Sequence, residues 1–212
     1  MLTRFLTDLA DQDVLLPVEA LVFVALLSLR LWRRAWAWAV VMAGGAALTL
    51  VLKLGLEACG PAPDRMLYSP SGHTMAGTMV YGCLLAMLRV RTSIVVGAAV
   101  VIACVLGWSR VALGVHTITE VLLGGGLGVG MVCLFRRLAG PPSAIPVQAV
   151  RGVVVATIAV IAICHGHRST IEIAIQDFSR FDLGPLLCRA DGHVAVAERE
   201  EGGWIFPGRE FH

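Results

Sequence analysis

The sequence predicts an all-α, polytopic membrane protein with six transmembrane helices in a bundle and a short extramembrane C-terminal tail. Of its 212 residues, 57% are hydrophobic and 15% are charged, whereas a soluble domain carries about 25% charged residues. The mean hydropathy is +0.79, and the apolar residues form long blocks that leave too little polar surface for a water-facing shell. These features exclude a compact cytosolic enzyme, a disordered chain and a small disulfide scaffold.

Apolar blocks of about 20 residues, the length that crosses a bilayer, occur in six places. They cover residues 14–32, 35–53, 74–90, 92–108, 115–135 and 149–165. The alternative for the first block is a signal peptide, but acidic residues precede it and arginines follow it, the reverse of what such a peptide requires. We therefore expect a membrane domain over 1–165 and a tail over 166–212, with a short hairpin near Gly202-Gly203.

Basic residues gather at alternate connections between the predicted spans. Eight arginines lie in or beside the first, third and fifth connections: Arg30, Arg33, Arg34, Arg89, Arg91, Arg136, Arg137 and Arg151. Positive charge marks the cytoplasmic side of a membrane protein, so the connections 54–73 and 109–114 and both termini face outward. We expect the protein in the cytoplasmic (inner) membrane, with these outer connections in the periplasm or its equivalent.

The net charge of +2 and the absence of any basic run longer than two residues argue against a nucleic-acid partner. Glycines are clustered within the fifth predicted span, as Gly124, Gly125, Gly126, Gly128 and Gly130. No strand precedes them, as a phosphate-binding glycine loop would require, whereas small residues four apart let membrane helices approach closely. We expect these glycines, and Gly44-Gly45 in the second span, to serve helix packing.

Polar residues concentrate in the two outer connections, and the second holds a candidate catalytic pair. His116 is followed by Glu120 four residues on. If the fifth span is helical from about Val115, the two side chains lie one turn apart on one face. Glu120 can then accept the proton of one imidazole nitrogen and leave the other nitrogen free to attack an electrophile.

An anion site is predicted beside this pair. Positive charge, a hydroxyl and exposed backbone N–H groups come from Lys53, Arg110, Ser71 and Gly72. Ser71 and Gly72 stand where the third span begins, at the positive end of a helix dipole, which suits a phosphate. Two histidines, His73 and His116, can divide the work, one attacking phosphorus and the other donating a proton to the leaving oxygen. This chemistry demands no metal and no cofactor.

The residues of both connections match a known pattern. Pro70-Ser71-Gly72-His73, followed by Ser109-Arg110, five residues, His116, three residues and Glu120, resembles the type 2 phosphatidic acid phosphatase and vanadium haloperoxidase superfamily, in its bacterial integral-membrane lipid phosphatase branch. Glu120 stands where the family has aspartate.

The resemblance implies a membrane phosphatase that acts at the outer leaflet on a lipid phosphate or diphosphate, of the prenyl diphosphate, phosphatidate-like or lipid A type. It implies His116 as the nucleophile, Glu120 as the residue that orients it and His73 as the acid. It also implies phosphate contacts for Lys53, Ser71, Gly72 and Arg110. The implied partners are the lipid phosphate and the surrounding membrane lipids.

The first motif of the family, a lysine, six residues and Arg-Pro, is incomplete here. Lys53 and Pro61 are in register, but Gly60 occupies the place of the arginine, so a bidentate guanidinium is absent. Glycine at this position could turn the loop back and let Arg65 replace it. Alternatively, the substrate needs less neutralisation or the activity is reduced.

Other functions remain open from the sequence. A phosphotransferase would pass the same phosphohistidine group to a lipid acceptor, and a catalytically impaired member would bind lipid or act as a scaffold. A transporter typically carries ionisable residues at mid-membrane, and apart from Glu19 the predicted spans have few. The sequence names neither the lipid nor the oligomeric state.

Six cysteines divide by location. Cys83, Cys104, Cys133 and Cys164 lie within predicted spans and are expected to pack as small apolar residues. Cys59 and Cys188 face the outer compartment, where a disulfide between them would pin the tail over the loop 54–73.

Overall fold

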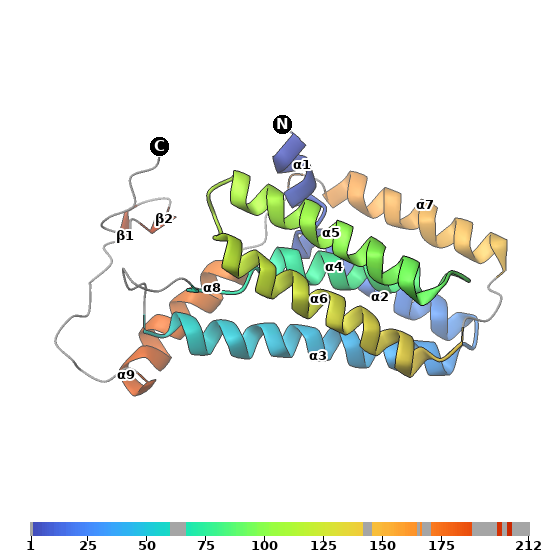
Figure 1. The fold of residues 1–212 in the computed structure, drawn as a ribbon, viewed down its shortest axis with the longest axis horizontal. Helices are drawn as coiled ribbons and strands as arrows, with labels where there is room; N and C mark the ends of the chain where they lie inside the picture. The colour runs from blue at the N-terminus through green and yellow to red at the C-terminus, as the bar shows by residue number, and fades with distance from the viewer. Residues whose placement is uncertain are drawn as a thin grey trace.

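The computed structural model describes residues 2–59, 67–141, 146–164, 166, 171–187, 199–200 and 203–204. These residues form helices apart from one small hairpin (Figure 1). The helices are α1 (Leu2–Asp8), α2 (Gln12–Ser28), α3 (Trp32–Glu57), α4 (Gly72–Ala86), α5 (Thr92–Ala112), α6 (Ile118–Ala139), α7 (Val147–Cys164), α8 (Ile171–Phe178), the π-helical turn η1 (Ser179–Leu183) and α9 (Gly184–Leu187). Strand β1 (Arg199–Glu200) pairs antiparallel with β2 (Gly203–Trp204), which confirms the predicted hairpin.

Each of the six predicted spans is a helix, α2 to α7. Four of them, α3, α5, α6 and α7, are long and apolar enough to cross a membrane. Helix α2 has 17 residues and α4 has 15, which is shorter than a typical span. The all-helical bundle with membrane-like helices is confirmed, while six complete crossings stay a prediction.

Helix α4 lies at the centre of the bundle, against α5, α6, α3 and α2. Nine of its 15 residues are buried, and Met79 and Val80 belong to one apolar core with residues of the neighbouring helices. Trp38 of α3 and Phe135 of α6 meet in this core edge to face, with ring centroids 6.1 Å apart, a favourable aromatic geometry.

Glycines set how closely α6 approaches α4. A Cβ built at Gly124 would lie 2.5 Å from the Ser71 carbonyl oxygen, and one at Gly128 would lie 2.8 Å from that of Met75. Gly125 is similarly close to α5, whereas Gly126 has nothing within 4 Å. The packing role is therefore confirmed for three glycines of the cluster, and Gly130, like Gly126, faces open space. Of the pair in α3, Gly45 abuts Met79 and Gly44 has no close neighbour.

Arginine side chains tie helix ends together at the end of the bundle opposite α8 (Figure 1). Arg33 Nε donates to the Leu138 carbonyl at 2.8 Å, and Arg136 donates to the carbonyls of Ala86 and Val90 at 2.9 and 3.0 Å. The Leu138 and Ala86 carbonyls belong to the C-terminal ends of α6 and α4, which a cation stabilises, and Val90 lies between α4 and α5. Arginines used to predict the orientation thus also donate hydrogen bonds to carbonyl groups at the helix ends.

Candidate active site

The site begins with the N-terminus of α6. Thr117 is the N-cap, its hydroxyl accepts from Glu120 N at 3.4 Å, and Glu120 Oε2 accepts from Thr117 N at 2.9 Å, a complete capping box. Helix α6 starts at Ile118, so the expectation that His116 itself is helical is wrong. The predicted pair nevertheless forms, because Glu120 turns back over the cap and its Oε2 lies 3.0 Å from His116 Nδ1.

Glu120 also holds the loop before α4. Its Oε1 accepts from the backbone N–H groups of Tyr68 and Ser69 at 3.0 and 3.1 Å, and its carbonyl accepts from Ser71 N at 3.1 Å. The side chain is 5% exposed. The Glu120 carboxylate therefore joins His116, the cap of α6 and the loop before Pro70, and the Glu120 carbonyl holds Ser71.

Ser71 and Gly72 stand at the N-terminus of α4, as predicted. Ser71 is the N-cap, and its hydroxyl accepts from Thr74 N at 3.4 Å and lies 2.9 Å from Thr74 Oγ1. Ser71 is fully buried. Its hydroxyl is already engaged in the cap through the contacts with Thr74. An anion at this helix end would therefore be bound by the backbone N–H groups of the first turn of α4 and stabilised by the helix dipole.

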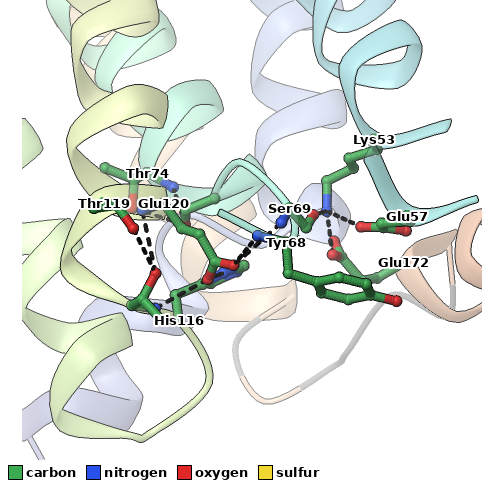
Figure 2. A network of polar contacts seen from close by, with 11 residues as sticks. Lys53, Glu57, Tyr68, Ser69, Thr74, His116, Thr119, Glu120 and Glu172 are labelled. Carbon is green, nitrogen blue, oxygen red and sulfur yellow. Dashed lines mark hydrogen bonds and ion pairs between the residues drawn. The ribbon is translucent and has the colours of Figure 1, made fainter. Parts of the chain in front are cut away.

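Lys53 reaches the same place from α3. Its side chain is 3% exposed, and a Cβ built at Gly72 would lie 3.3 Å from Lys53 Cε. Its Nζ donates to Ser69 Oγ at 3.3 Å and pairs with Glu57 at 3.8 Å. Ser69, to which the sequence assigned no role, thereby connects Lys53 to Glu120, and Figure 2 shows the network running from His116 to Lys53.

A carboxylate from the tail completes this network. Glu172 of α8 forms an ion pair with Lys53 Nζ (Figure 2), and its second oxygen, Oε2, would lie 3.9 Å from a Cβ at Gly72. Burial alone would raise the pKa of Glu172, but the Lys53 ammonium and its hydrogen bond lower it below the usual range. Glu172 is therefore ionised at neutral pH. The sequence carries no motif that indicates this residue.

His73 follows Gly72 in the first turn of α4, and Arg110 acts on it electrostatically. The His73 side chain is 17% exposed, and its Nε2 lies 3.5 Å from Asp11 Oδ2. Arg110 is in the last turn of α5, and its charge acts on His73 together with those of Asp11 and Glu172. The predicted residues Lys53, Ser71, Gly72, His73, Arg110, His116 and Glu120 thus surround one helix N-terminus. The sequence also gave no signal for Asp11.

Several residues singled out by the sequence lie outside the described part of the chain or outside this network. Gly60, Pro61 and Arg65 lie outside the described residues. Cys59 is disulfide-bonded, and Cys188, the partner expected, is likewise outside the described part of the chain. The cysteines assigned to packing, Cys83, Cys104, Cys133 and Cys164, are free thiols. Within the described ranges, no group of three or more His, Cys, Asp or Glu side chains could hold a metal ion.

The geometry suits transfer of a phosphoryl group. An imidazole fixed by a carboxylate through Nδ1 presents Nε2 as a nucleophile. A lysine, an arginine and a helix N-terminus surround the position where an anion would bind. A second imidazole nearby can exchange protons with that anion. These features, gathered at one end of a helical bundle with membrane-like helices, are the ones that phosphoryl transfer would use.

Comparison with known proteins identifies the family. The PAP2 superfamily profile matches residues 55–141, which include Ser71 to Glu120. Phosphatidylglycerophosphatase B of Bacillus subtilis is 31% identical over 145 residues, which cover 61% of this chain and 69% of that protein. An uncharacterized 22.5 kDa protein in the cps region of Klebsiella pneumoniae is 29% identical over 142 residues, 64% of this chain and 68% of that one. No solved structure matches. The chain belongs to the PAP2 superfamily, as its motifs predict.

Proposed function

We propose that this protein is a membrane phosphatase that hydrolyses a lipid phosphate or diphosphate through a phosphohistidine on His116. The family and the phosphatase relative support phosphatase activity in general. The observation that carries the finer proposal is the part-buried contact between His116 Nδ1 and Glu120 Oε2 at 3.0 Å, because it fixes the imidazole in one orientation.

The proposed reaction has two steps. In the first, His116 Nε2 attacks phosphorus, the bond from phosphorus to the lipid oxygen breaks, and His73 gives its proton to that oxygen. In the second, water attacks the phosphohistidine, the N–P bond breaks, and His73 takes the proton of the water. Inorganic phosphate and the dephosphorylated lipid leave, and both histidines return to their starting state. No step in this sequence uses a metal ion.

Substrate oxygens would be held by the groups around Gly72. Lys53 and Arg110 neutralise charge, and the N–H groups of the first turn of α4 bind the oxygens. Ser71 supports this turn as its cap. Arg65 is proposed to supply the guanidinium that Gly60 lacks.

The site is proposed to open to the periplasm, with the protein in the inner membrane. Two features support this orientation. Cys59, at the same end of the bundle as Lys53, is disulfide-bonded, and disulfides persist outside the reducing cytoplasm. The opposite end carries Arg33, Arg34 and Arg136, which belong to the first and fifth connections, as cytoplasmic connections do.

Phosphate release from defined lipids tests the proposal. Purified protein should release inorganic phosphate from at least one of a prenyl diphosphate, a phosphatidate, a phosphatidylglycerophosphate or a lipid A phosphate, with and without a chelator. His116→Ala should abolish release. Activity that is lost in chelator and restored by magnesium, or that survives in His116→Ala, would contradict the mechanism. Transfer of the group to a lipid acceptor, with no free phosphate, would identify a phosphotransferase instead.

A further inference from the structure

The N-terminal segment is anchored to the helix that carries His73. Residues His73, Gly77 and Tyr81 are spaced four apart, so they share one face of α4. Tyr81 donates its hydroxyl to the Leu9 carbonyl at 2.6 Å, and a Cβ built at Gly77 would lie 3.0 Å from Ala10 Cβ. Gly77 therefore makes room for the turn between α1 and α2.

That turn brings a buried carboxylate to the histidine. Asp11 follows Ala10, is 6% exposed, and uses its two oxygens differently. Oδ1 accepts from Asp13 N at 3.0 Å and caps α2, while Oδ2 lies 3.5 Å from His73 Nε2. Thr7 of α1 holds the preceding residues against α5, since its hydroxyl lies 3.2 Å from that of Ser109.

We propose, on the basis of the proposed function, that Asp11 is the positioning residue of the acid His73, as Glu120 is of His116. The carboxylate on Nε2 fixes the ring and leaves Nδ1 as the atom that gives its proton to the leaving oxygen. Each histidine then has one buried carboxylate: Glu120 from the start of α6 and Asp11 from the start of α2.

Electrostatics supports the assignment. Burial disfavours the protonated form of His73, and the charge of Arg110 acts in the same direction. Asp11 and Glu172 are the carboxylates that act on His73, and both favour the protonated form. Burial and Arg110 outweigh the two carboxylates, so the pKa of His73 lies below its usual value. Without Asp11 it would fall further, and less of the protonated form would be available for donation.

The variant Asp11→Asn tests this role, because asparagine keeps the helix cap while it removes the charge. An acid matters for an alkoxide leaving group and little for p-nitrophenolate. We therefore expect the rate of the first step, measured as the burst of released alcohol, to fall by about tenfold or more for an alkyl phosphate lipid, with the burst of p-nitrophenolate from p-nitrophenyl phosphate essentially unchanged. Asp13→Asn removes a carboxylate from the same turn and should match wild type on both substrates.

A double mutant tests whether Asp11 acts on the reaction through His73. In a His73→Ala background, Asp11→Asn should add no further loss, because the two residues act as one unit. Equal loss on both substrates, no loss on either, or an additive loss in the double mutant would each overturn the role of Asp11. The proposed function fails separately, if His116→Ala keeps its activity.

A second inference rests on a different contact, between the tail and Lys53. Glu172 pairs with Lys53 beside Gly72, and His73 and His116 both act electrostatically on its carboxylate. Helix α8 is held there by the turn that follows it, since Ser179 Oγ donates to the Leu54 carbonyl at 2.8 Å and Arg180 Nη2 donates to Tyr68 Oη at 2.6 Å. A carboxylate thus pairs with the lysine that is proposed to bind a phosphate oxygen.

We infer, again on the basis of the proposed function, that Glu172 is an internal competitor for phosphate and must withdraw before substrate binds. Vanadate and inorganic phosphate are suitable probes because they bind the anion site without a lipid. Glu172→Gln should lower the inhibition constants of both by several-fold, as the competing charge is gone. Asp182→Asn, which alters an exposed carboxylate of η1, should leave both constants at the wild-type value.

Lys53→Met separates the two hypotheses. It should raise both inhibition constants, because it removes the cation from the proposed phosphate site. Wild-type constants in Lys53→Met would overturn the proposed anion site itself. Constants that rise in Lys53→Met but are unchanged or higher in Glu172→Gln would overturn only the competition by Glu172.

Discussion

At the scale of the residue, Glu120 explains how the chain can depart from the family aspartate and still keep the contact with His116. As the third residue of α6, glutamate is the residue that closes a capping box with Thr117. The same carboxylate reaches His116 and the N–H groups of Tyr68 and Ser69. The extra methylene therefore serves both the fold and the site.

Glu120→Asp, which restores the family residue, should consequently lower activity. The shorter side chain cannot keep the capping box, His116 and the loop N–H groups together. We expect a loss of about 1 kcal/mol in unfolding free energy, typical of a lost cap, and a lower kcat. Thermal unfolding and phosphate release measure the two effects, and wild-type values of both would show that the glutamate is interchangeable.

Arg65 is the residue proposed to replace the missing guanidinium. Arg65→Ala should cost about 2–4 kcal/mol of transition-state stabilisation, as loss of one preorganised charge donor does. Phosphate release by Arg65→Ala, and by Gly60→Arg combined with Arg65→Ala, measures this. Recovery in the double variant would show that both positions serve one phosphate oxygen, whereas near-normal activity in the single variant would reject the role.

At the scale of the element, Gly124 positions the Pro-Ser-Gly-His segment. Its α-carbon faces the Ser71 carbonyl, and a Cβ would lie 2.5 Å from that oxygen. Gly124→Ala should therefore push α6 from α4, lower the unfolding free energy by about 1–3 kcal/mol and reduce kcat. Gly126→Ala is the matched control, because nothing lies within 4 Å of its Cβ. Equal unfolding free energies and equal kcat values for the two variants would show that close packing at Gly124 does not position the segment.

The six helices were predictable because their apolar blocks are long and uninterrupted, and the site motifs were predictable because their spacing is local. The start of α6 was misplaced, since the apolar pattern includes Val115 but Thr117 caps the helix later. Asp11 and Glu172 were not predictable. They reach His73 and Lys53 across 62 and 119 positions of the chain, and no periodicity records such contacts.

At the scale of the whole molecule, the proposed orientation predicts which positions are accessible from outside. In a background that lacks native cysteines, Arg65→Cys should react with an impermeant thiol reagent in intact cells, and Arg91→Cys should not. Permeabilised cells are the control, in which both should react. Labelling of position 91 alone in intact cells would reverse the orientation and move the chemistry to the cytoplasm.

The two ends of the bundle differ in the polar contacts that they carry. One end joins helices through arginines on carbonyl groups, and the other collects side chains from α3, α4, α5, α6 and α8 around Gly72. The first turn of α4 therefore lies where the described residues before α4, the residues before α6 and the described part of the tail meet. This convergence supports a site that acts on phosphate at the membrane surface.

Direct detection of the phosphohistidine tests the mechanism at its centre. His73→Ala lacks the group proposed to activate water, so it should accumulate the intermediate when given p-nitrophenyl phosphate, which needs no acid for its departure. Mass spectrometry after rapid quenching under alkaline conditions should find phosphate on His116, and none in His73→Ala combined with His116→Ala. Turnover of p-nitrophenyl phosphate by His73→Ala with no phosphate on His116, and persisting when His116 is also removed, would contradict the mechanism.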